Sequence, residues 1–244
     1  MGIAAGYREW APPPALGPVL ACLWSSRSPD PGPLVLPDGC SDLIWRQGHG
    51  AFVAGPDTGP VRTPMPTGTV LVSVRFRPGA GGQLLGVPLR ELRDQRVDLA
   101  DLRPDLARAL PPDLDPGQVA ARLTRLAGQL ADNAPPDRAV LRACRLLASP
   151  AAHAEDVADA VGLSPRQLRR RTEAAAGYGP KLLQRVLRFR RFVSVIDATA
   201  GAADLAAAAL TSGYADQPHL TRESVQLAGL PPAALIRARH PRTS

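Results

Sequence analysis

Two stretches of this chain share one layout, and that layout most constrains its fold. Val161 to Gly177 has the sequence VGLSPRQLRRRTEAAAG, and Ser212 to Ala228 has the sequence SGYADQPHLTRESVQLA. In each, a glycine, which permits the positive φ of a tight turn, follows a helix rich in small residues that a second helix can cross closely. Two helix-turn-helix units in tandem are therefore predicted.

Capping residues and apolar spacing predict the helices around these units. Ser164 caps a helix that begins at Pro165, and Asp216 caps one that begins at Gln217. Upstream, apolar residues at positions 119, 123, 126 and 130 predict an amphipathic helix with Asp115 as its cap. The expected helices span 115–131, 137–148, 154–161, 165–176, 181–196, 203–211 and 217–228, and Pro231-Pro232 opens a last short turn or helix.

Residues 1 to about 90 contain short apolar runs separated by turn signals such as Pro-Asp-Gly at 37–39. Strands are expected at 19–24, 34–36, 42–45, 51–54 and 69–76, and a helix within 88–102. Short strands at this spacing suggest a small β-sandwich or barrel. The predicted class is α+β: a β-rich N-terminal domain over 1–110, an amphipathic helix and linker over 111–134, and an all-α tandem helix-turn-helix domain over 135–244.

Charge divides the chain into two unlike halves. Up to Ala134, 13 arginines balance 13 acidic residues, whereas from Pro135 onward 16 basic residues face 9 acidic ones. The whole net charge of +7 therefore belongs to the C-terminal part. A polyanionic partner is expected for that part only.

The second helix of a helix-turn-helix enters the major groove with its N-terminal half against the base edges. Arginine can pair with guanine and glutamine with adenine, each through two hydrogen bonds, and helix N-termini can bind phosphate. The candidate DNA-binding residues are Ser164, Arg166, Gln167, Arg169 and Arg170 in the first unit, and Gln217, His219, Thr221 and Arg222 in the second.

The helix expected at 181–196 joins the two units and would span roughly 24 Å. With the turns at its ends it could set the two recognition helices about 34 Å apart, which is one turn of duplex. Its arginines at 185, 188, 190 and 191 are candidates either for phosphate contacts or for a solvated face with internal salt bridges.

Residues 135 to 241 resemble the DNA-binding domain of the AraC-type transcriptional regulators. The motifs that carry the resemblance are VADAVGLSPRQLRRR, GYGPKLLQRVLRFRRF and AALTSGYADQPHLTRE with AGLPPAAL. The run LPDGCSDLIW, with FRPGAGGQLLGVPLRELRDQRVDL, resembles the N-terminal domain of one subgroup of these regulators.

The resemblance implies a seven-helix unit that binds double-stranded DNA, with Arg188 bracing its two halves. It further implies an N-terminal domain that senses a small-molecule effector or forms a homodimer, and RNA polymerase as a partner if the protein is an activator. Thr172 and Ser224 stand where the family usually has phenylalanine, and Gly179 where serine is common. Loss of a core ring costs about 3–5 kcal/mol when nothing refills the space, so the second unit is expected to be the less rigid reader.

In the N-terminal half, Trp24, Trp45 and Phe52 are expected either to build the β core or to line an apolar ligand pocket together with Cys40. Cys40 is expected to be a reduced, half-buried thiol, because it lacks an adjacent His or Lys to lower its pKa. The alternative function is a ligand-binding or redox-sensing module with a weakened DNA-binding domain.

Other classes find less support in the sequence. The three cysteines are widely spaced, which predicts neither disulfides nor zinc, and His49 is the only histidine of the first half, which argues against a metal site there. No catalytic motif stands out, so neither an enzyme nor a cofactor is expected. DNA-repair alkyl acceptors carry a similar helix-turn-helix domain, but the cysteine cluster that binds their zinc is absent. Without a signal-like or membrane-spanning apolar run, the expected location is the cytoplasm.

Overall fold

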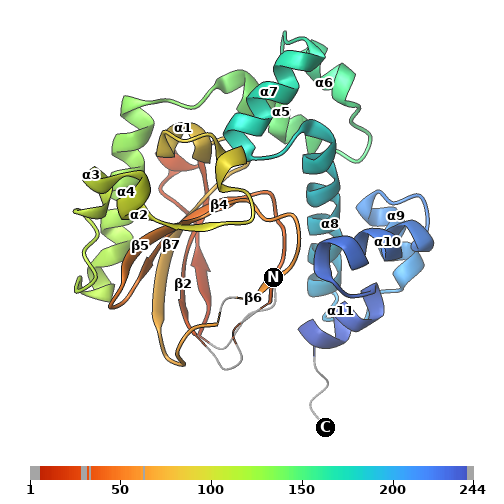
Figure 1. Ribbon diagram of the computed structural model, residues 1–244. Helices are drawn as coiled ribbons and strands as arrows, with labels where there is room; N and C mark the ends of the chain where they lie inside the picture. Colours follow the sequence, from red (N-terminus) through yellow and green to blue (C-terminus); the bar gives the residue numbers. More distant parts are fainter. Residues whose placement is uncertain (1–5, 29–31, 33, 63, 241–244) are drawn as a thin grey trace.

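The computed structural model describes residues 6–28, 32, 34–62 and 64–240. Its N-terminal part is built on one six-stranded antiparallel sheet in the order β1-β2-β7-β4-β5-β8, beside a two-stranded ribbon of β3 and β6. Figure 1 shows the sheet between two groups of helices, with α2, α3 and α4 on one side and α8 on the other. The strands are β1 (Arg8–Trp10), β2 (Leu20–Arg27), β3 (Leu34–Val35), β4 (Ser41–Arg46), β5 (Gly50–Ala54), β6 (Val61–Arg62), β7 (Val70–Phe76) and β8 (Arg96–Asp98).

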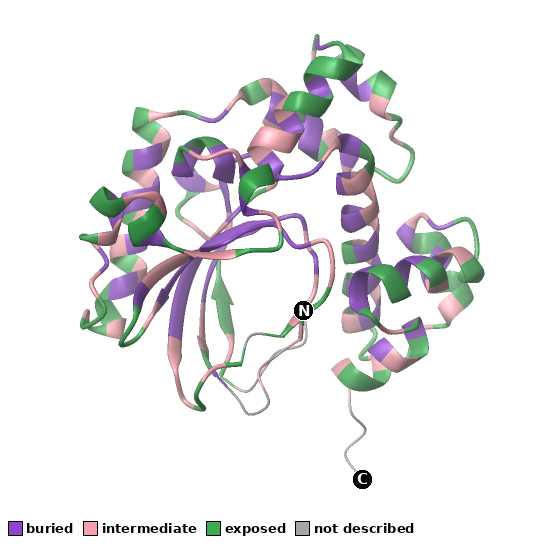
Figure 2. Ribbon diagram, in the orientation of Figure 1, coloured by how far each residue is buried: buried purple, intermediate pink, exposed green. Residues whose placement is uncertain are grey.

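Alternation along the strands gives the sheet two different faces. On β4, Leu43 and Trp45 join the main N-terminal core, whereas Ile44 belongs to a smaller apolar cluster on the opposite face. Trp24 and Leu71 lie in the same smaller cluster. The face that carries the main core is covered by helices, and the other face looks toward the C-terminal domain (Figures 1 and 2).

The amphipathic helix α4 (Pro116–Asn133) packs its apolar stripe into the main N-terminal core. Asp115 caps it by accepting a hydrogen bond of 3.0 Å from the backbone N–H of Gly117. Val119 and Leu123 are fully buried there, so α4 is part of the N-terminal unit and not only a connector. The other elements of this unit are η1 (Pro14–Leu16), α1 (Gly81–Leu85), η2 (Leu89–Leu92), α2 (Leu99–Leu102) and α3 (Pro104–Ala107).

Two expectations for this half need correction. The sheet does not close into a barrel: among the described residues, β1 and β8 form its two edges. The segment 88–102 is not one helix, because Asp94 adopts a positive φ of 60° that breaks it after η2. The chain then continues as β8, which pairs with the edge of β5 and satisfies backbone hydrogen-bonding groups there. Val97 lies opposite Val53.

The C-terminal part is all helical, with α8 at its centre. The first unit, α5 to α7, packs on one end of α8, and α9 to α11 pack farther along it (Figure 1). Gly162 and Gly213 have φ of 68° and 89°, as the turns of the two predicted units require. The helices are α5 (Arg138–Leu147), α6 (Ala154–Ala160), α7 (Pro165–Ala176), α8 (Pro180–Ala198), α9 (Leu205–Ser212), α10 (Gln217–Ala228) and α11 (Pro232–Arg239). None of the helices in the described ranges is long and apolar enough to cross a membrane.

Candidate nucleic-acid interface and effector pocket

The first recognition helix, α7, begins with a reciprocal capping box. The Ser164 hydroxyl accepts a hydrogen bond from the backbone N–H of Gln167, and the Gln167 side-chain oxygen accepts one of 2.9 Å from the backbone N–H of Ser164. These bonds satisfy two free amides at the start of the helix. Both side chains therefore have a local structural role, and the side-chain NH₂ of Gln167 and the O–H of Ser164 remain as donors to DNA.

The arginines of α7 differ in what they contact. Arg171 turns inward to Asp137 at 3.0 Å, and Arg169 pairs with Glu173 one turn later at 3.0 Å. Arg166 and Arg170 are exposed, and neither has a carboxylate within ion-pair distance among the described residues. These two guanidinium groups are the ones that α7 leaves available to a polyanion.

In the second recognition helix, α10, some polar groups likewise have partners within the protein and others are free. Asp216 caps it by accepting a 2.6 Å hydrogen bond from the backbone N–H of His219, whose ring meets Tyr214 edge-on at 5.2 Å. The Thr221 hydroxyl donates to the backbone oxygen of Gln217 at 2.9 Å. The side chains of Gln217 and Arg222 are exposed. The cap uses only the backbone N–H of His219, so its ring nitrogens have no hydrogen-bond partner among the described residues.

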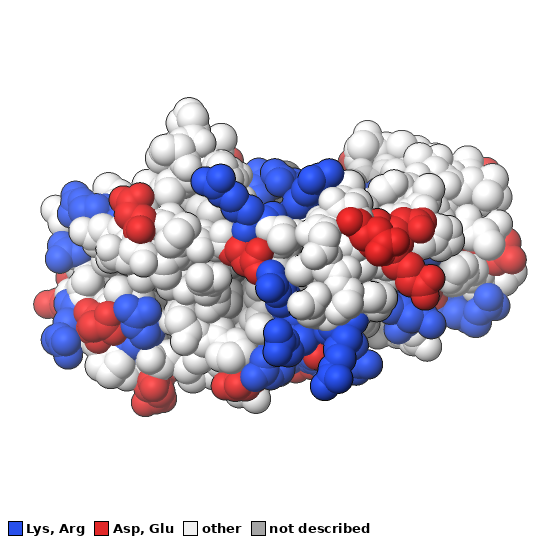
Figure 3. All heavy atoms as spheres, turned by 90° about the horizontal axis from the view of Figure 1, so that it is seen from above, with Lys and Arg blue, Asp and Glu red and all other residues white. Residues whose placement is uncertain are grey.

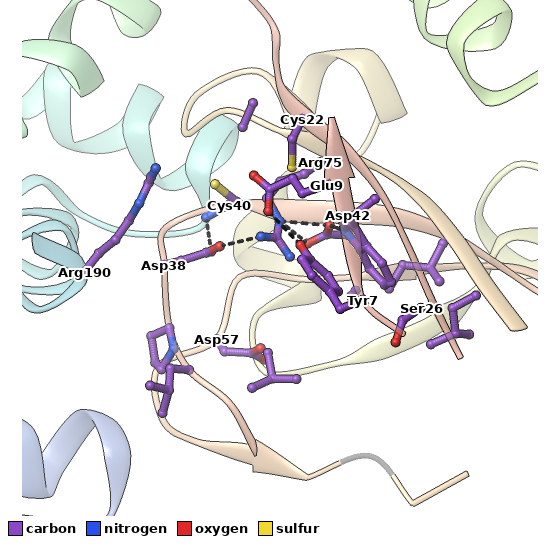
Figure 4. Close-up of a pocket in the computed structure, with 18 of the residues that line it drawn as sticks. Tyr7, Glu9, Cys22, Ser26, Asp38, Cys40, Asp42, Asp57, Arg75 and Arg190 are labelled. Carbon is purple, nitrogen blue, oxygen red and sulfur yellow. Dashed lines mark hydrogen bonds and ion pairs between the residues drawn. The ribbon is translucent and has the colours of Figure 1, made fainter. Parts of the chain in front are cut away.

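The second unit is held on α8 by a charged brace. Glu223 of α10, whose side chain is 8% exposed, accepts hydrogen bonds from Arg185 at 2.6 Å and from Arg188 at 3.4 Å. Arg188 also lies over the ring of Tyr214 at 5.0 Å, and Arg191 donates to the backbone oxygen of Ser212 at 3.2 Å. These three arginines are braces within the domain, whereas Arg190 is exposed and reaches toward the N-terminal domain (Figure 4).

The two recognition helices are thus fixed to one rod. With 19 residues, α8 spans about 28 Å at the rise of an α-helix, which is somewhat longer than the 16-residue helix that the sequence predicts. The space-filling view from above shows Lys and Arg side chains gathered in the lower middle and in the upper middle of the molecule, whereas basic and acidic side chains alternate at its left (Figure 3).

A pocket of about 430 Å³ opens between the second face of the sheet and α8. The sheet wall of this pocket combines apolar side chains with ion pairs, and Figure 4 shows Arg75 between Asp38 and Asp42. Asp42 accepts hydrogen bonds from the indole of Trp24 at 2.6 Å and from Arg75 at 3.1 Å, and Arg75 also pairs with Asp38 at 3.4 Å. The apolar side chains of the pocket include Trp24, Ile44, Phe52, Met65 and Leu71, and α8 contributes Arg190, Val193 and Ser194.

Burial governs the chemistry of the titratable groups in this pocket. It raises the pKa of Asp42, although Arg75 and the Trp24 N–H oppose the shift. It also raises the pKa of the Cys40 thiol, with a further contribution from the charge of Asp38, and it raises the pKa of Cys22 to about 12. Very little thiolate is present near neutral pH, so these environments do not favour a redox sensor.

Three of the four residues expected at an effector pocket line this one, namely Trp24, Cys40 and Phe52. Cys40 is fully buried, not half-buried as expected. Of the two roles expected of Trp45, the structure shows the core role and not the pocket role, because strand alternation directs it to the other face of β4, where its indole donates to the backbone oxygen of Pro111 at 2.8 Å. Two further pocket residues, Asp42 and Arg75, carry no local sequence signal, because only the strand pairing of β4 with β7 places them side by side.

Comparison with known proteins divides the chain in the same way. Residues 8–98 match a domain of unknown function, DUF6597, and residues 157–238 match a helix-turn-helix domain. Residues 157–238 form an AraC-type helix-turn-helix domain. No curated protein sequence matches the chain significantly.

The chain is also similar to solved structures of ToxT from Vibrio cholerae. One from strain O395 has a TM-score of 0.47 at 9% identity and covers 98% of this chain and 100% of that one. Another, in the P21 form, has a TM-score of 0.48 at 10% identity over 97% and 100% of the two chains. A third, with an unsaturated fatty acid bound to ToxT, has a TM-score of 0.43 at 11% identity over 90% and 94%. At this identity the likeness concerns the fold alone.

Within the AraC-type domain, the two residues that stand where phenylalanine is usual have hydrogen-bonded hydroxyl groups. Thr172 and Ser224 are fully buried. The Thr172 hydroxyl bonds to the backbone oxygen of Leu168 at 2.9 Å, and the Ser224 hydroxyl bonds to that of Leu230 at 2.7 Å. Neither polar group is left unsatisfied, which removes the largest cost of burying it.

Proposed function

We propose that this protein is a DNA-binding transcriptional regulator that reads two successive major grooves with α7 and α10. The observation that carries the proposal is the AraC-type domain itself: two recognition helices held on α8, each with an exposed N-terminal half. An exposed, basic helix start is what entry into a major groove requires. The two ion pairs of buried Glu223 with Arg185 and Arg188 support a fixed orientation of the second helix.

Within this proposal, Arg166 and Arg170 contact the first groove, and Gln217 and Arg222 contact the second. Guanidinium groups without an acidic partner lose no ion pair when they bind guanine or phosphate, so they are the strongest candidates for base contacts. Ser164, Gln167, Arg169 and Thr221 have side-chain partners within the protein and are proposed as orienting residues that reach DNA with their remaining groups. His219 uses only its backbone N–H in the cap, so its ring nitrogens are proposed to contact DNA directly.

The N-terminal domain is proposed to take a small-molecule effector in the 430 Å³ pocket, a volume within the usual range for ligand sites. Because α8 forms one wall of that pocket, an occupant touches the helix that spaces the two recognition helices. This contact gives an effector a direct route to DNA affinity. A homodimer, and RNA polymerase in the case of an activator, remain proposed partners.

Selection of bound sequences from random duplex DNA, followed by fluorescence anisotropy on the selected site, tests the proposal. Arg170→Ala should weaken binding by about 1–3 kcal/mol and relax preference at one position. The matched control is Arg125→Ala, which removes an exposed arginine from α4. Failure to enrich any sequence, or equal affinities of the two variants, would overturn the assignment.

A further inference from the structure

Three arginines from different parts of the chain meet at the junction of the two domains. Arg77 follows β7, Arg145 is on α5 and Arg190 is on α8. All three line a hollow of about 130 Å³ whose other walls are largely apolar. Those walls include Pro18, Leu141, Cys144 and Leu187.

The charges of this cluster are not balanced by the protein. Among the described residues, none of the three guanidinium groups has a carboxylate within ion-pair distance. Arg77 donates its Nε to the backbone oxygen of Gly17 at 2.7 Å, which leaves its terminal nitrogens free. The arginines of the neighbouring pocket behave differently, since Arg75 and Arg96 both pair with aspartates. Three like charges that line one hollow repel one another, and an anion bound among them would offset that repulsion.

We propose that Arg77, Arg145 and Arg190 form a binding site for a phosphate-type oxyanion at the domain junction. Guanidinium forks match the paired oxygens of phosphate, and three of them suit an anion with more than one charge. A hollow of about 130 Å³ has room for a tetrahedral anion.

The site joins both domains, because Arg77 belongs to the N-terminal unit and the other two to the C-terminal one. A bound anion therefore links the sheet to α5 and α8. Binding of the free oxyanion requires neither DNA nor an occupant of the effector pocket, whereas binding of an organic phosphate rests on the effector pocket of the proposed function. Arg77 and Arg190 also line the effector pocket, which gives the organic part of a phosphate ester somewhere to lie.

Calorimetric titration of the full chain with inorganic phosphate, at constant ionic strength, tests the proposal. Arg145→Gln and Arg190→Gln should each weaken phosphate binding about tenfold or more, the loss of one charge-assisted contact. Arg138→Gln is the matched control on α5: it removes an exposed arginine that does not line the hollow, and affinity should stay within about twofold.

Phenyl phosphate separates the two sources of the oxyanion. Tighter binding than inorganic phosphate, lost in Trp24→Ala, assigns an organic phosphate; equal binding of the two assigns the free ion. Equal phosphate affinity in all variants, or equal heat from acetate at the same ionic strength, overturns the site. The site is also overturned if Arg145→Gln weakens DNA binding at every sequence and leaves phosphate binding unchanged, because the arginines would then bind the DNA backbone.

Discussion

Removing the charge of Glu223 should weaken sequence recognition by α10 and leave recognition by α7 intact. Its side chain is 8% exposed and accepts hydrogen bonds from Arg185 and Arg188, which are themselves 31% and 22% exposed. Glu223→Gln keeps the shape of the side chain but removes its charge. The change should therefore test the ion pairs and not the packing around them.

The magnitude follows from the geometry. A hydrogen bond to a charged group contributes about 1.5–3 kcal/mol, and only the Arg185 contact, at 2.6 Å, has strong geometry. Both arginines are partly solvated, so solvent screening reduces this figure, and we expect a loss of about 2 kcal/mol in the free energy of unfolding. For a chain of this size that corresponds to a fall in Tm of roughly 4–8 °C.

Glu173→Gln provides the matched comparison, because Glu173 pairs with Arg169 on the surface of α7 at 3.0 Å. An exposed i,i+4 pair contributes about 0.3–0.5 kcal/mol. Urea unfolding of both variants measures the difference. DNA affinity should also fall in Glu223→Gln, with sequence preference lost in the half-site read by α10 and retained in the other. Equal destabilisation by the two variants would refute the brace.

Two other substitutions test the junction and the C-terminal cap of the domain. The hydroxyl of buried Tyr178 donates to the backbone oxygen of Asp57 at 2.6 Å. Tyr178→Phe should therefore lower the free energy of unfolding by about 1 kcal/mol and speed limited proteolysis between the domains. An unchanged digestion rate would contradict a role at the junction. Burial alone would raise the pKa of Asp197, but its ion pair with Arg239 lowers the pKa to about 2. Because the folded-state pKa lies below the unfolded one, this stabilisation is complete above about pH 4 and is lost as pH falls toward 2. The stability gap between the wild type and Asp197→Asn should narrow over that window, and a constant gap in thermal unfolding would show that the charge is not responsible.

The sequence predicts local structure best where spacing and caps agree. The bounds of α7 and α10 match the expected ranges, because Ser164 and Asp216 mark their starts and Gly177 and Gly229 their ends. The segment after Pro88 misled the prediction, since its local pattern is compatible with a helix. The free edge of β5, which the sequence cannot place in space, converts residues 96–98 into a strand.

The candidate sites were harder to predict, because they depend on which side chains find partners within the protein. Sequence spacing groups Arg166 with Arg169 but cannot reveal that Glu173 engages only the second. In the same way, Arg188 and Arg190 are near neighbours on one helix, yet one pairs with Glu223 and the other reaches the N-terminal domain. A helix surface turns by about 100° per residue, so tertiary packing decides their separate roles.

Asp57 links the pocket to the first recognition helix through two different groups. Its carboxylate lines the pocket and pairs with Arg96 at 2.7 Å, while its backbone oxygen accepts the hydroxyl of Tyr178, between α7 and α8. One residue earlier, the backbone oxygen of Gly177 accepts a 2.9 Å hydrogen bond from Arg93. Arg96 belongs to the N-terminal domain and Tyr178 to the C-terminal one. A shift of the loop at Asp57 therefore cannot leave both the Asp57–Arg96 ion pair and the Tyr178–Asp57 hydrogen bond unchanged. An effector that displaced this loop would therefore act on the end of α7, and one that moved α8 would act on both recognition helices.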